Sequence, residues 1–503
     1  MNLVPAMTLA GHCLLAWLDP DRGFMPVGGY ETAHDTGRWW DAMLRLEHAT
    51  GFPIPPETEA AMLGNLRLLT DNPFGILMNR PDIEWMRESA VFNAHNLRET
   101  FLSLSALARY RRSEWAVEAG RLHLRNLGRF LLPDGGLDQA GIVARLGAVG
   151  SDDPLLVQPP VAGWRDETAS TGRALEAILD FHEATGDPLA LQVAHRIARF
   201  HLEHSIHPTG TIRPELVDPC HVGHNHSYLG TLRGLLRYGI RTDRPDIVSM
   251  VAATYRNALW RSNISWSGWT PHDLGKTRFP DAAGDPVGEH ASCGDVVQLA
   301  LWLGIHLGRP EYLDDAERLL RARLLPSQVV DDPDPRQCGA WGVFGDNFGR
   351  GSILDVFAAV LHTLVDAAAH TVLPGPGGSV SIHLHATART PWADVRCQRG
   401  ERGRLEVVPR KASGLRIRVP GWAPRDSLAL SVDGRSIRLR WESEYLLVAP
   451  DQAAAGSTVV LSYDLPRSET VEEMPVSRRR FRLAWRGDGV TACDPPVPIH
   501  PAW

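Results

Sequence analysis

Amphipathic helices alternating with short turns run through most of this chain, from about residue 37 to residue 370. The turns combine glycine with proline, as in Gly186-Asp187-Pro188 and Gly308-Arg309-Pro310. Glycine ends a helix because it adopts the left-handed conformation easily, and proline suits the first turn of the next helix. The turns recur roughly every 55–75 residues, which is long for a solenoid but suits helical hairpins separated by longer loops. The pattern therefore predicts a closed ring of hairpins, an (α/α)6 toroid.

Each hairpin is expected to place one helix inside the ring and one outside. Leu175, Ile178 and Leu179 show the three- and four-residue spacing of an apolar helix face. Five hairpins followed by a closing helix would complete the ring. Helices are expected over residues 37–50, 97–109, from the turn at 111–113 through Phe130, and over 171–185, 189–204, 227–238, 246–260, 295–307, 311–325 and 352–368.

The pattern changes after Thr371. A linker rich in helix breakers, Pro374-Gly375-Pro376-Gly377-Gly378, precedes segments in which polar and apolar residues alternate, beginning with 379–385. This alternation is typical of β-strands with one buried face, and turn signals such as Asp433-Gly434 separate the segments. The sequence therefore predicts a mainly α protein with a β domain: a toroid over residues 1–372 and a C-terminal β-sandwich over 373–503.

Charge and cysteine usage exclude several classes of partner. The net charge of −7, with no basic stripe to offset it, argues against a nucleic-acid partner. The six cysteines show no C-x-x-C spacing, so a disulfide framework or zinc ribbon is not expected. No segment has the length of a membrane span, and the apolar run 14–18 lacks the flanks of a signal peptide. We expect a cytoplasmic protein, monomeric or homodimeric, with no membrane partner.

Clusters of polar residues precede the predicted inner helices. Because the inner helices of such a ring run parallel, all of these clusters would meet at one mouth. Acids, imidazoles, arginines and tryptophan together suit a carbohydrate, whose hydroxyls need polar partners and whose C–H face packs on an indole. The predicted sugar-binding residues are His34, Asp35, Arg38, His95, Arg98, His224, His226, Trp341 and Asn347.

Glycoside hydrolysis needs one carboxylic acid to protonate the leaving oxygen and one carboxylate as nucleophile or base. Glu289, Asp346 and Glu167 are the predicted catalytic carboxylates. Structural roles stay open for several of these polar residues. An acid such as Asp35 near a helix start also caps the helix, an arginine such as Arg38 also pairs with a structural acid, and a histidine also satisfies buried backbone groups.

Several motifs carry a family resemblance. Residues 415–423 (L-R-I-R-V-P-G-W-A) followed by Val432-Asp433-Gly434, residues 288–294 (G-E-H-A-S-C-G) and residues 29–51 resemble glycoside hydrolase family 127, the six-hairpin β-L-arabinofuranosidases. The resemblance spans nearly the whole chain. It implies a toroid followed by a β-sandwich, hydrolysis of an L-arabinofuranoside-like glycoside, and a place for Glu289 on the sugar-facing loop.

The same motifs depart from the family at its metal site. Family members hold zinc with a glutamate and three cysteines, and one cysteine of the pair in C-C-x-x-N-x-x-R is the nucleophile. Here Asn347-Phe348-Gly349-Arg350 matches the second half, which places Val343 and Phe344 at the cysteine pair. The resemblance therefore identifies a divergent member without the cysteine pair, and no cofactor is favoured. Zinc remains an alternative, with ligands drawn from His221, His224, His226, Glu289 and Cys293.

Two other functions remain open. A polysaccharide lyase with the same architecture would use Tyr30 or Tyr228 with a histidine and an arginine that binds a uronate. A non-catalytic carbohydrate-binding protein would explain the missing cysteine pair. A carbohydrate is the expected ligand in all three cases.

Overall fold

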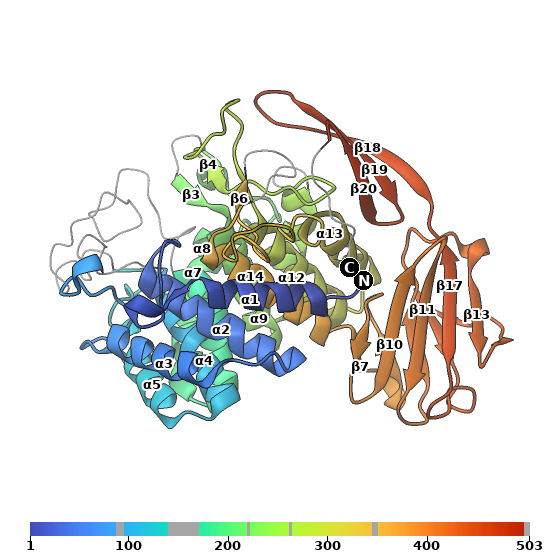
Figure 1. Cartoon of the computed structure of the whole chain (residues 1–503), viewed down its shortest axis with the longest axis horizontal. Coiled ribbons are helices and arrows are strands. Elements are labelled where there is room, and N and C mark those ends of the chain that lie inside the picture. Colours follow the sequence, from blue (N-terminus) through green and yellow to red (C-terminus); the bar gives the residue numbers. More distant parts are fainter. Residues whose placement is uncertain (87–94, 139–170, 219–221, 261–263, 345–350, 497–503) are drawn as a thin grey trace.

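Six inner helices form a closed ring in the computed structural model, which describes residues 1–86, 95–138, 171–218, 222–260, 264–344 and 351–496. Each inner helix packs against the next, and the last returns to the first (Figure 1). The predicted (α/α)6 toroid is thereby confirmed. The inner helices are α2 (Thr32–Thr50), α4 (Asn96–Arg111), α7 (Thr171–Thr185), α9 (Asn225–Arg241), α12 (His290–His306) and α14 (Leu354–Ala369).

An outer layer of helices surrounds the ring. Four of its helices begin at a proline, and Gly51, Gly186 and Gly308 end inner helices with positive φ, as the turn pattern predicted. The outer helices α1 and α3 were not predicted; α1 covers α2 and α14. The outer helices are α1 (Val4–Ala16), α3 (Pro56–Thr70), α5 (Glu114–Leu127), α8 (Pro188–His204), α10 (Pro245–Thr254) and α13 (Pro310–Leu319). None of the described helices is both long and apolar enough to cross a bilayer.

Glycines bring α7 and α9 close together. A Cβ on Gly172 would lie 2.2 Å from Thr231 Oγ1, and one on Gly234 would lie 2.8 Å from Leu175 Cβ. Larger side chains at these positions would push the two helices apart. The close contact keeps the ring narrow, so the starts of the inner helices lie near one another.

Two antiparallel-rich sheets form the predicted β-sandwich. The first has the order β14-β13-β17-β11-β10-β9 and the second β15-β16-β12-β8-β7. Inward-facing Leu405, Leu461 and Ile417 belong to the core between them. The strands of the two sheets are β7 (Val372–Pro374), β8 (Val380–Ile382), β9 (Ala388–Arg389), β10 (Ala393–Arg399), β11 (Arg402–Pro409), β12 (Leu415–Arg418), β13 (Ala429–Val432), β14 (Arg435–Ser436), β15 (Trp441–Glu442), β16 (Tyr445–Val448) and β17 (Val459–Asp464).

Arg418 joins the sandwich to the toroid. Its guanidinium is fully buried, donates to Glu317 Oε2 at 2.5 Å and also pairs with Asp314, both on α13. Arg418 belongs to the L-R-I-R-V-P-G-W-A motif, so that motif serves the contact between the two parts of the chain.

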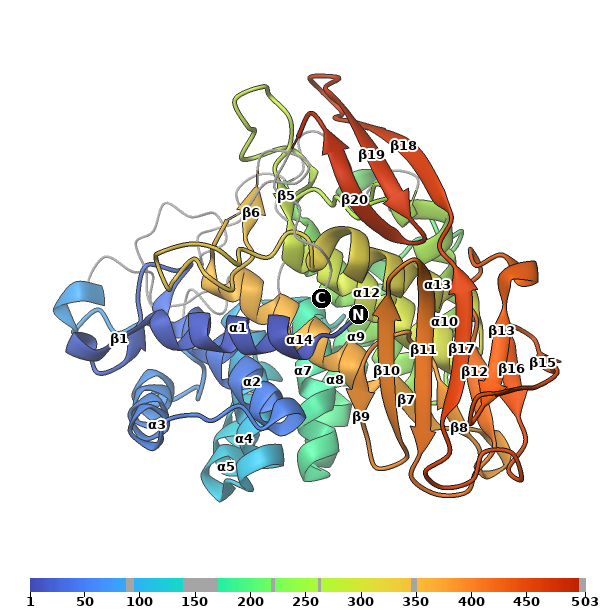
Figure 2. The same cartoon turned by 45° about the vertical axis from the view of Figure 1, so that its right-hand side comes forward.

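The last three strands lie outside the sandwich. Strands β18 (Arg467–Glu473), β19 (Arg480–Arg486) and β20 (Gly489–Asp494) form a separate sheet that packs Phe481 and Trp485 against Ala322, just beyond α13. Figures 1 and 2 show this sheet beside the end of the toroid that carries β3 to β6. The C-terminal segment therefore returns to the toroid, on the side where the inner helices begin.

Candidate active site

Each of the six inner helices contributes a side chain to one cavity. The contributing residue lies just before the helix or in its first turn, which is the convergence that the parallel helices predicted. The cavity has a volume of 330 Å³ and is lined by Tyr30, His95, Arg173, His224, His272, Arg278, Phe279, Glu289, Val343, Ile353, Asp355 and Val356. This size suits a sugar residue. We call it the mouth pocket.

Two short antiparallel ladders set one wall of the mouth pocket. Strand β3 (Val222–His224) pairs with β4 (Asp273–Gly275), which puts His224 opposite Asp273. Strand β5 (Gly288–Glu289) pairs with β6 (Val343–Phe344), which puts Glu289 opposite Val343. Both ladders lead directly into inner helices, so they align residues that are distant in sequence at the starts of α9 and α12.

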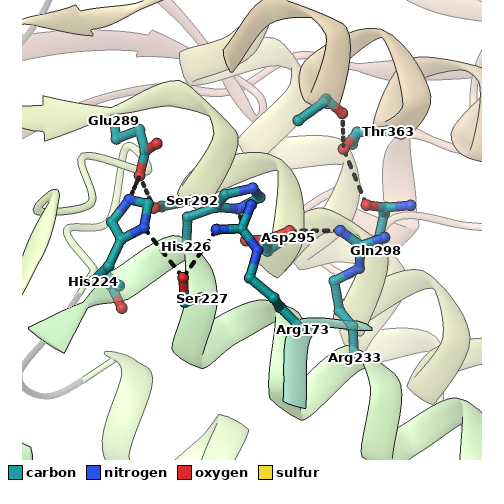
Figure 3. A network of polar contacts seen from close by, with 12 residues as sticks. Arg173, His224, His226, Ser227, Arg233, Glu289, Ser292, Asp295, Gln298 and Thr363 are labelled. Carbon is teal, nitrogen blue, oxygen red and sulfur yellow. Dashed lines mark hydrogen bonds and ion pairs between the residues drawn. The ribbon is translucent and has the colours of Figure 1, made fainter. Parts of the chain in front are cut away.

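Glu289 and His224 meet on this wall. Glu289 Oε2 lies 3.4 Å from His224 Nε2 and accepts a hydrogen bond of 2.6 Å from Ser292 Oγ (Figure 3). Burial raises the pKa of Glu289, but His224, His272 and Ser292 outweigh it and lower that pKa to about 2. Glu289 is therefore an ionised carboxylate on the pocket wall.

His272 is held on the same wall by its neighbour. Its Nδ1 lies 2.8 Å from Asp273 Oδ1, and Arg278 donates to the same carboxylate oxygen from Nε at 2.8 Å. Burial raises the pKa of Asp273, yet its bonds with His272 and Arg278 bring it down to about 2. Beside them Phe279 is 58% exposed, so its ring offers an apolar face at the pocket rim.

A buried ion-pair network supports the pocket from below. Glu99 Oε1 forms an ion pair with Arg38, whose Nε is 2.8 Å away, and accepts a hydrogen bond of 2.5 Å from Arg98 Nη2. Arg38 Nη2 also lies 2.8 Å from His226 Nε2, whose Nδ1 is 2.6 Å from Asp295 Oδ2. The structural alternative for Arg38 and Arg98 is thus what the structure shows: both pair with a buried acid.

Asp355 is the second carboxyl group of the mouth pocket. It lies in the first turn of α14, and His34 Nε2 is 3.8 Å from its Oδ2. Burial raises the pKa of Asp355; Arg38 opposes this, Glu289 and Glu99 reinforce it, and the result is a pKa of about 6. Asp355 is therefore suited to donating a proton near neutral pH.

Asp35 lies behind Asp355 and is fully buried. Neither of its carboxyl oxygens has a hydrogen-bond partner among the described residues, and Glu31, at the N-cap position of α2, makes no side-chain capping bond either. Burial and the nearby acids Asp355 and Glu31 raise the pKa of Asp35 well above its usual range. Asp35 is thus held away from water beside other acids, and it does not act as a helix cap.

The predicted site residues fall into four groups. His95, His224 and Glu289 line the mouth pocket, whereas His34, Asp35, Arg38, Arg98 and His226 lie in the layer beneath it. Trp341 does not reach the pocket, because it is fully buried and donates from Nε1 to the carbonyl oxygen of Leu324 at 2.6 Å. Its position beside a polar cluster gave the wrong interpretation. Glu167, Asp346 and Asn347, like His221, lie outside the described residues.

Sequence reasoning missed four polar residues of the pocket. Arg173 and Asp355 each lie in the first turn of an inner helix, so the rule that identified His34 and Asp35 would have found them. His272 and Arg278 lie on a loop without helical periodicity, and no sequence signal marks them. Tyr228, the alternative base of a lyase, is fully buried and does not line the pocket, whereas Tyr30 does.

The family's zinc ligands do not fit this chain. Val343 lies opposite Glu289, where the resemblance places a cysteine, and neither Val343 nor Phe344 has a donor atom for a metal. Cys293 does not line the pocket; its sulfur packs near Gly268, and burial raises the pKa of its thiol to about 12. A glutamate with three cysteines is therefore excluded at these described positions.

Comparisons with known proteins agree with this architecture. No family model and no curated protein matches the chain by sequence. Among solved structures, a GH127 β-L-arabinofuranosidase from Geobacillus stearothermophilus T6 is 13% identical, with a TM-score of 0.58 over 96% of this chain and 80% of that one. A second GH127 β-arabinofuranosidase is 13% identical, with a TM-score of 0.62 over 97% of this chain and 81% of that one.

A sugar isomerase is also similar. The D-mannose isomerase structure is 11% identical, with a TM-score of 0.50 over 72% of this chain and 97% of that one, so the likeness is confined to part of this chain. The GH127 structures, in contrast, match nearly all of it. The chain therefore has the fold of the GH127 β-L-arabinofuranosidases, an (α/α)6 toroid followed by a β-sandwich.

Proposed function

We propose that this chain is a glycoside hydrolase that cleaves its substrate in the mouth pocket. One observation carries the proposal: two carboxyl groups, those of Glu289 and Asp355, line the same sugar-sized cavity from different inner helices. Hydrolysis of a glycoside needs an acid on the leaving oxygen and a second group at the nucleophile. The likeness to GH127 β-L-arabinofuranosidases supports this reaction class and makes an L-arabinofuranoside the first substrate to test.

Asp355 acts as the proton donor in this proposal, and the wall that holds His224 and Glu289 orients the attacking water. The water oxygen bonds to the anomeric carbon while the bond from that carbon to the leaving oxygen breaks. The proton of Asp355 passes to the leaving oxygen, and the proton lost by the water passes to the His224–Glu289 pair. The pKa of about 6 for Asp355 supports the role of acid.

Other pocket residues would hold the sugar. Arg173, Arg278 and His95 offer groups for its hydroxyls, and Tyr30 and Phe279 offer aromatic faces at the rim. These two rings replace Trp341 as the partners for a sugar C–H face.

The test uses Asp355→Asn and Glu289→Gln with a panel of aryl and natural glycosides, L-arabinofuranosides first. We expect each substitution to lower kcat by about 10²–10⁴-fold, the usual contribution of a general acid or base. Asp246→Asn, an exposed acid on the outer helix α10, is the matched control and should retain the activity. Full activity in Asp355→Asn would refute the proposed role of Asp355.

Aldose–ketose isomerisation is the second candidate. It is favoured by the likeness to D-mannose isomerase and by two pocket histidines, His95 and His224, whose rings stack with centroids 6.0 Å apart. Two imidazoles on one sugar are suited to moving a proton between carbons. Nuclear magnetic resonance of free aldoses incubated with the protein would reveal ketose formation, and its absence would leave hydrolysis alone.

A further inference from the structure

We infer that His224, His272 and Glu289 form a binding site for a divalent cation, and that zinc is the best match. This inference adds a cation to the site of the proposed function. It rests on the proposed function only where it says that the cation would take part in catalysis. Binding of the cation is argued from the three residues themselves. The set differs from the one that the sequence left open, of which only His224 and Glu289 remain.

The three residues already have the spacing of metal ligands. Each offers one ligand atom, and these atoms all lie within 4.8 Å of one another. His224 Nε2 and Glu289 Oε2 are 3.4 Å apart. Ligands of tetrahedral zinc at ~2.0–2.2 Å from the ion are separated by roughly 3.3 Å, so this pair needs no rearrangement. His272 lies within 4.8 Å of both and would move closer when the cation binds.

Outer contacts hold both imidazoles in the orientation that a metal needs. Arg278 pairs with the Asp273 carboxylate, which also lies 2.8 Å from His272 Nδ1; a donating Nδ1 there leaves His272 Nε2 with a free lone pair. His224 Nδ1 lies 3.2 Å from Ser227 Oγ, which also accepts from Arg173 Nη1 at 3.1 Å (Figure 3). A donating Nδ1 there likewise leaves His224 Nε2 as the acceptor. Metal-binding histidines are typically fixed by such a second partner.

One buried atom of the pocket wall lacks a hydrogen-bond partner among the described residues. His224 Nε2 is shielded from solvent and makes no hydrogen bond with any described residue, although it faces Glu289. An unsatisfied buried acceptor costs free energy, so its presence indicates a partner that the chain does not supply. A cation between His224 and Glu289 would satisfy both.

Two other residues that could ligate a cation, His226 and Cys293, are held away from this site by other contacts. His226 lies between Arg38 and Asp295, and Cys293 packs outside the pocket near Gly268. In the described part of the chain, the set of His224, His272 and Glu289 is the single cluster with this ligand spacing.

Two histidines and one glutamate are a ligand set of catalytic zinc sites, which keep a further position open to water or substrate. Here the open side faces the mouth pocket, which all three ligands line. A divalent cation at this place would supply a water of lowered pKa, and hence hydroxide at neutral pH. The cation would thus take over the activation of the water that the proposed function assigns to the His224–Glu289 pair in the metal-free chain.

The experiment measures metal binding directly on the full chain. The purified protein is stripped with a chelator, titrated with zinc chloride by calorimetry, and analysed for zinc after gel filtration. We expect one zinc ion per chain. Cobalt(II) in place of zinc should give the visible absorption bands of a tetrahedral or five-coordinate site, a readout that needs no substrate.

Variants then locate the ion. Asp273→Asn should weaken zinc binding by about 10–100-fold, the usual effect of losing an outer partner. His272→Ala and Glu289→Gln should weaken it further and abolish the cobalt bands. His95→Ala, a pocket histidine outside the set, is the matched control and should bind zinc like the parent protein. Circular dichroism of each variant excludes loss of folding as the cause.

The outcomes separate this inference from the proposed function. Absence of stoichiometric zinc, or zinc binding that survives in His272→Ala and Glu289→Gln, would overturn the cation site. If the chelator-stripped protein cleaves a glycoside at the full rate, the cation has no part in catalysis although the hydrolase is real. Tight, variant-sensitive zinc binding with no cleavage of any glycoside would support the site and argue against the proposed function.

Discussion

Asp355 is surrounded by groups that shift its pKa in opposite directions. Burial raises that pKa, Arg38 lowers it, and Glu289 and Glu99 raise it again, with a result of about 6. Asp355 is therefore mostly protonated at pH 5 and mostly ionised at pH 8. As the proposed acid, it is active only in the protonated form.

The pH profile of the reaction should show this titration. We expect kcat/KM of the parent protein to fall as the pH rises through about 6, because Asp355 then loses the proton that the leaving oxygen needs. In Asp355→Asn the residual kcat/KM should not show this fall between pH 5 and 7. The measurement is kcat/KM between pH 4.5 and 8 on one glycoside. An unchanged fall in the variant would assign the titration to another group.

Single residues were the hardest part of the site to predict. Glu289, His224 and His95 were found because a polar residue before a buried helix is visible in the sequence. His272 was missed because its contact with His224 depends on the β3–β4 ladder, whose partners are about fifty positions apart along the chain. Trp341 was placed wrongly because a tryptophan next to polar residues looks the same whether it is buried or faces a ligand.

At the scale of elements, strand β12 shows how the sandwich is fixed to the toroid. Arg418 is fully buried with Glu317, whereas Arg416, two residues earlier on the same strand, pairs with Glu442, which is half exposed. Removing one partner of a buried pair leaves an uncompensated charge. An exposed pair contributes little because water screens it.

Arg418→Met should therefore destabilise the protein by about 3–5 kcal/mol. Arg416→Met, on the same strand, is the matched control and should cost less than about 1 kcal/mol. Urea unfolding followed by tryptophan fluorescence measures both free energies. Equal effects of the two substitutions would show that Arg418 is not the link between the sheet and α13.

The helices were predicted well because their ends have a chemical signature. The proline and glycine residues at the turns predicted where α8, α10 and α13 begin to within a residue or two of the observed starts. Helix α1 was missed because its apolar residues are spread around the helix and do not repeat on one face. Its contacts with α2 and α14 are therefore not visible as a periodic pattern in the sequence. The sequence analysis placed strands β18 to β20 in the sandwich, although they form a separate sheet. Alternation of polar and apolar residues predicts a strand but does not indicate which sheet the strand joins.

At the scale of the whole molecule, the C-terminal sheet reaches the active-site loop. The turn between β18 and β19 holds Asp285, which accepts from the backbone N–H groups of Val476 and Ser477 at 2.8 and 2.9 Å. Arg479 pairs with Asp285 and Asp281. The loop over residues 276–286 carries Arg278 and Phe279 of the mouth pocket, so the last strands position part of the site.

Asp285→Ala should loosen this loop while leaving the catalytic groups in place. We expect KM to rise by about 10-fold, equivalent to roughly 1.4 kcal/mol of binding, with a smaller change in kcat. Hydrogen exchange of residues 276–286 should become faster. Glu473→Gln, which removes an exposed pair with Arg480 on the same hairpin, is the control. A change in kcat alone, with unchanged exchange, would contradict the proposed positioning.

All six inner helices point their N-termini at the pocket. Each helix end carries roughly half a positive charge, so the ring of helix poles amounts to about +3 around the cavity. Such a field attracts anions and opposes the cationic transition state of glycoside cleavage. The ionised carboxylate of Glu289 on the pocket wall therefore has an electrostatic role of its own: its negative charge opposes the positive potential that the six helix ends create.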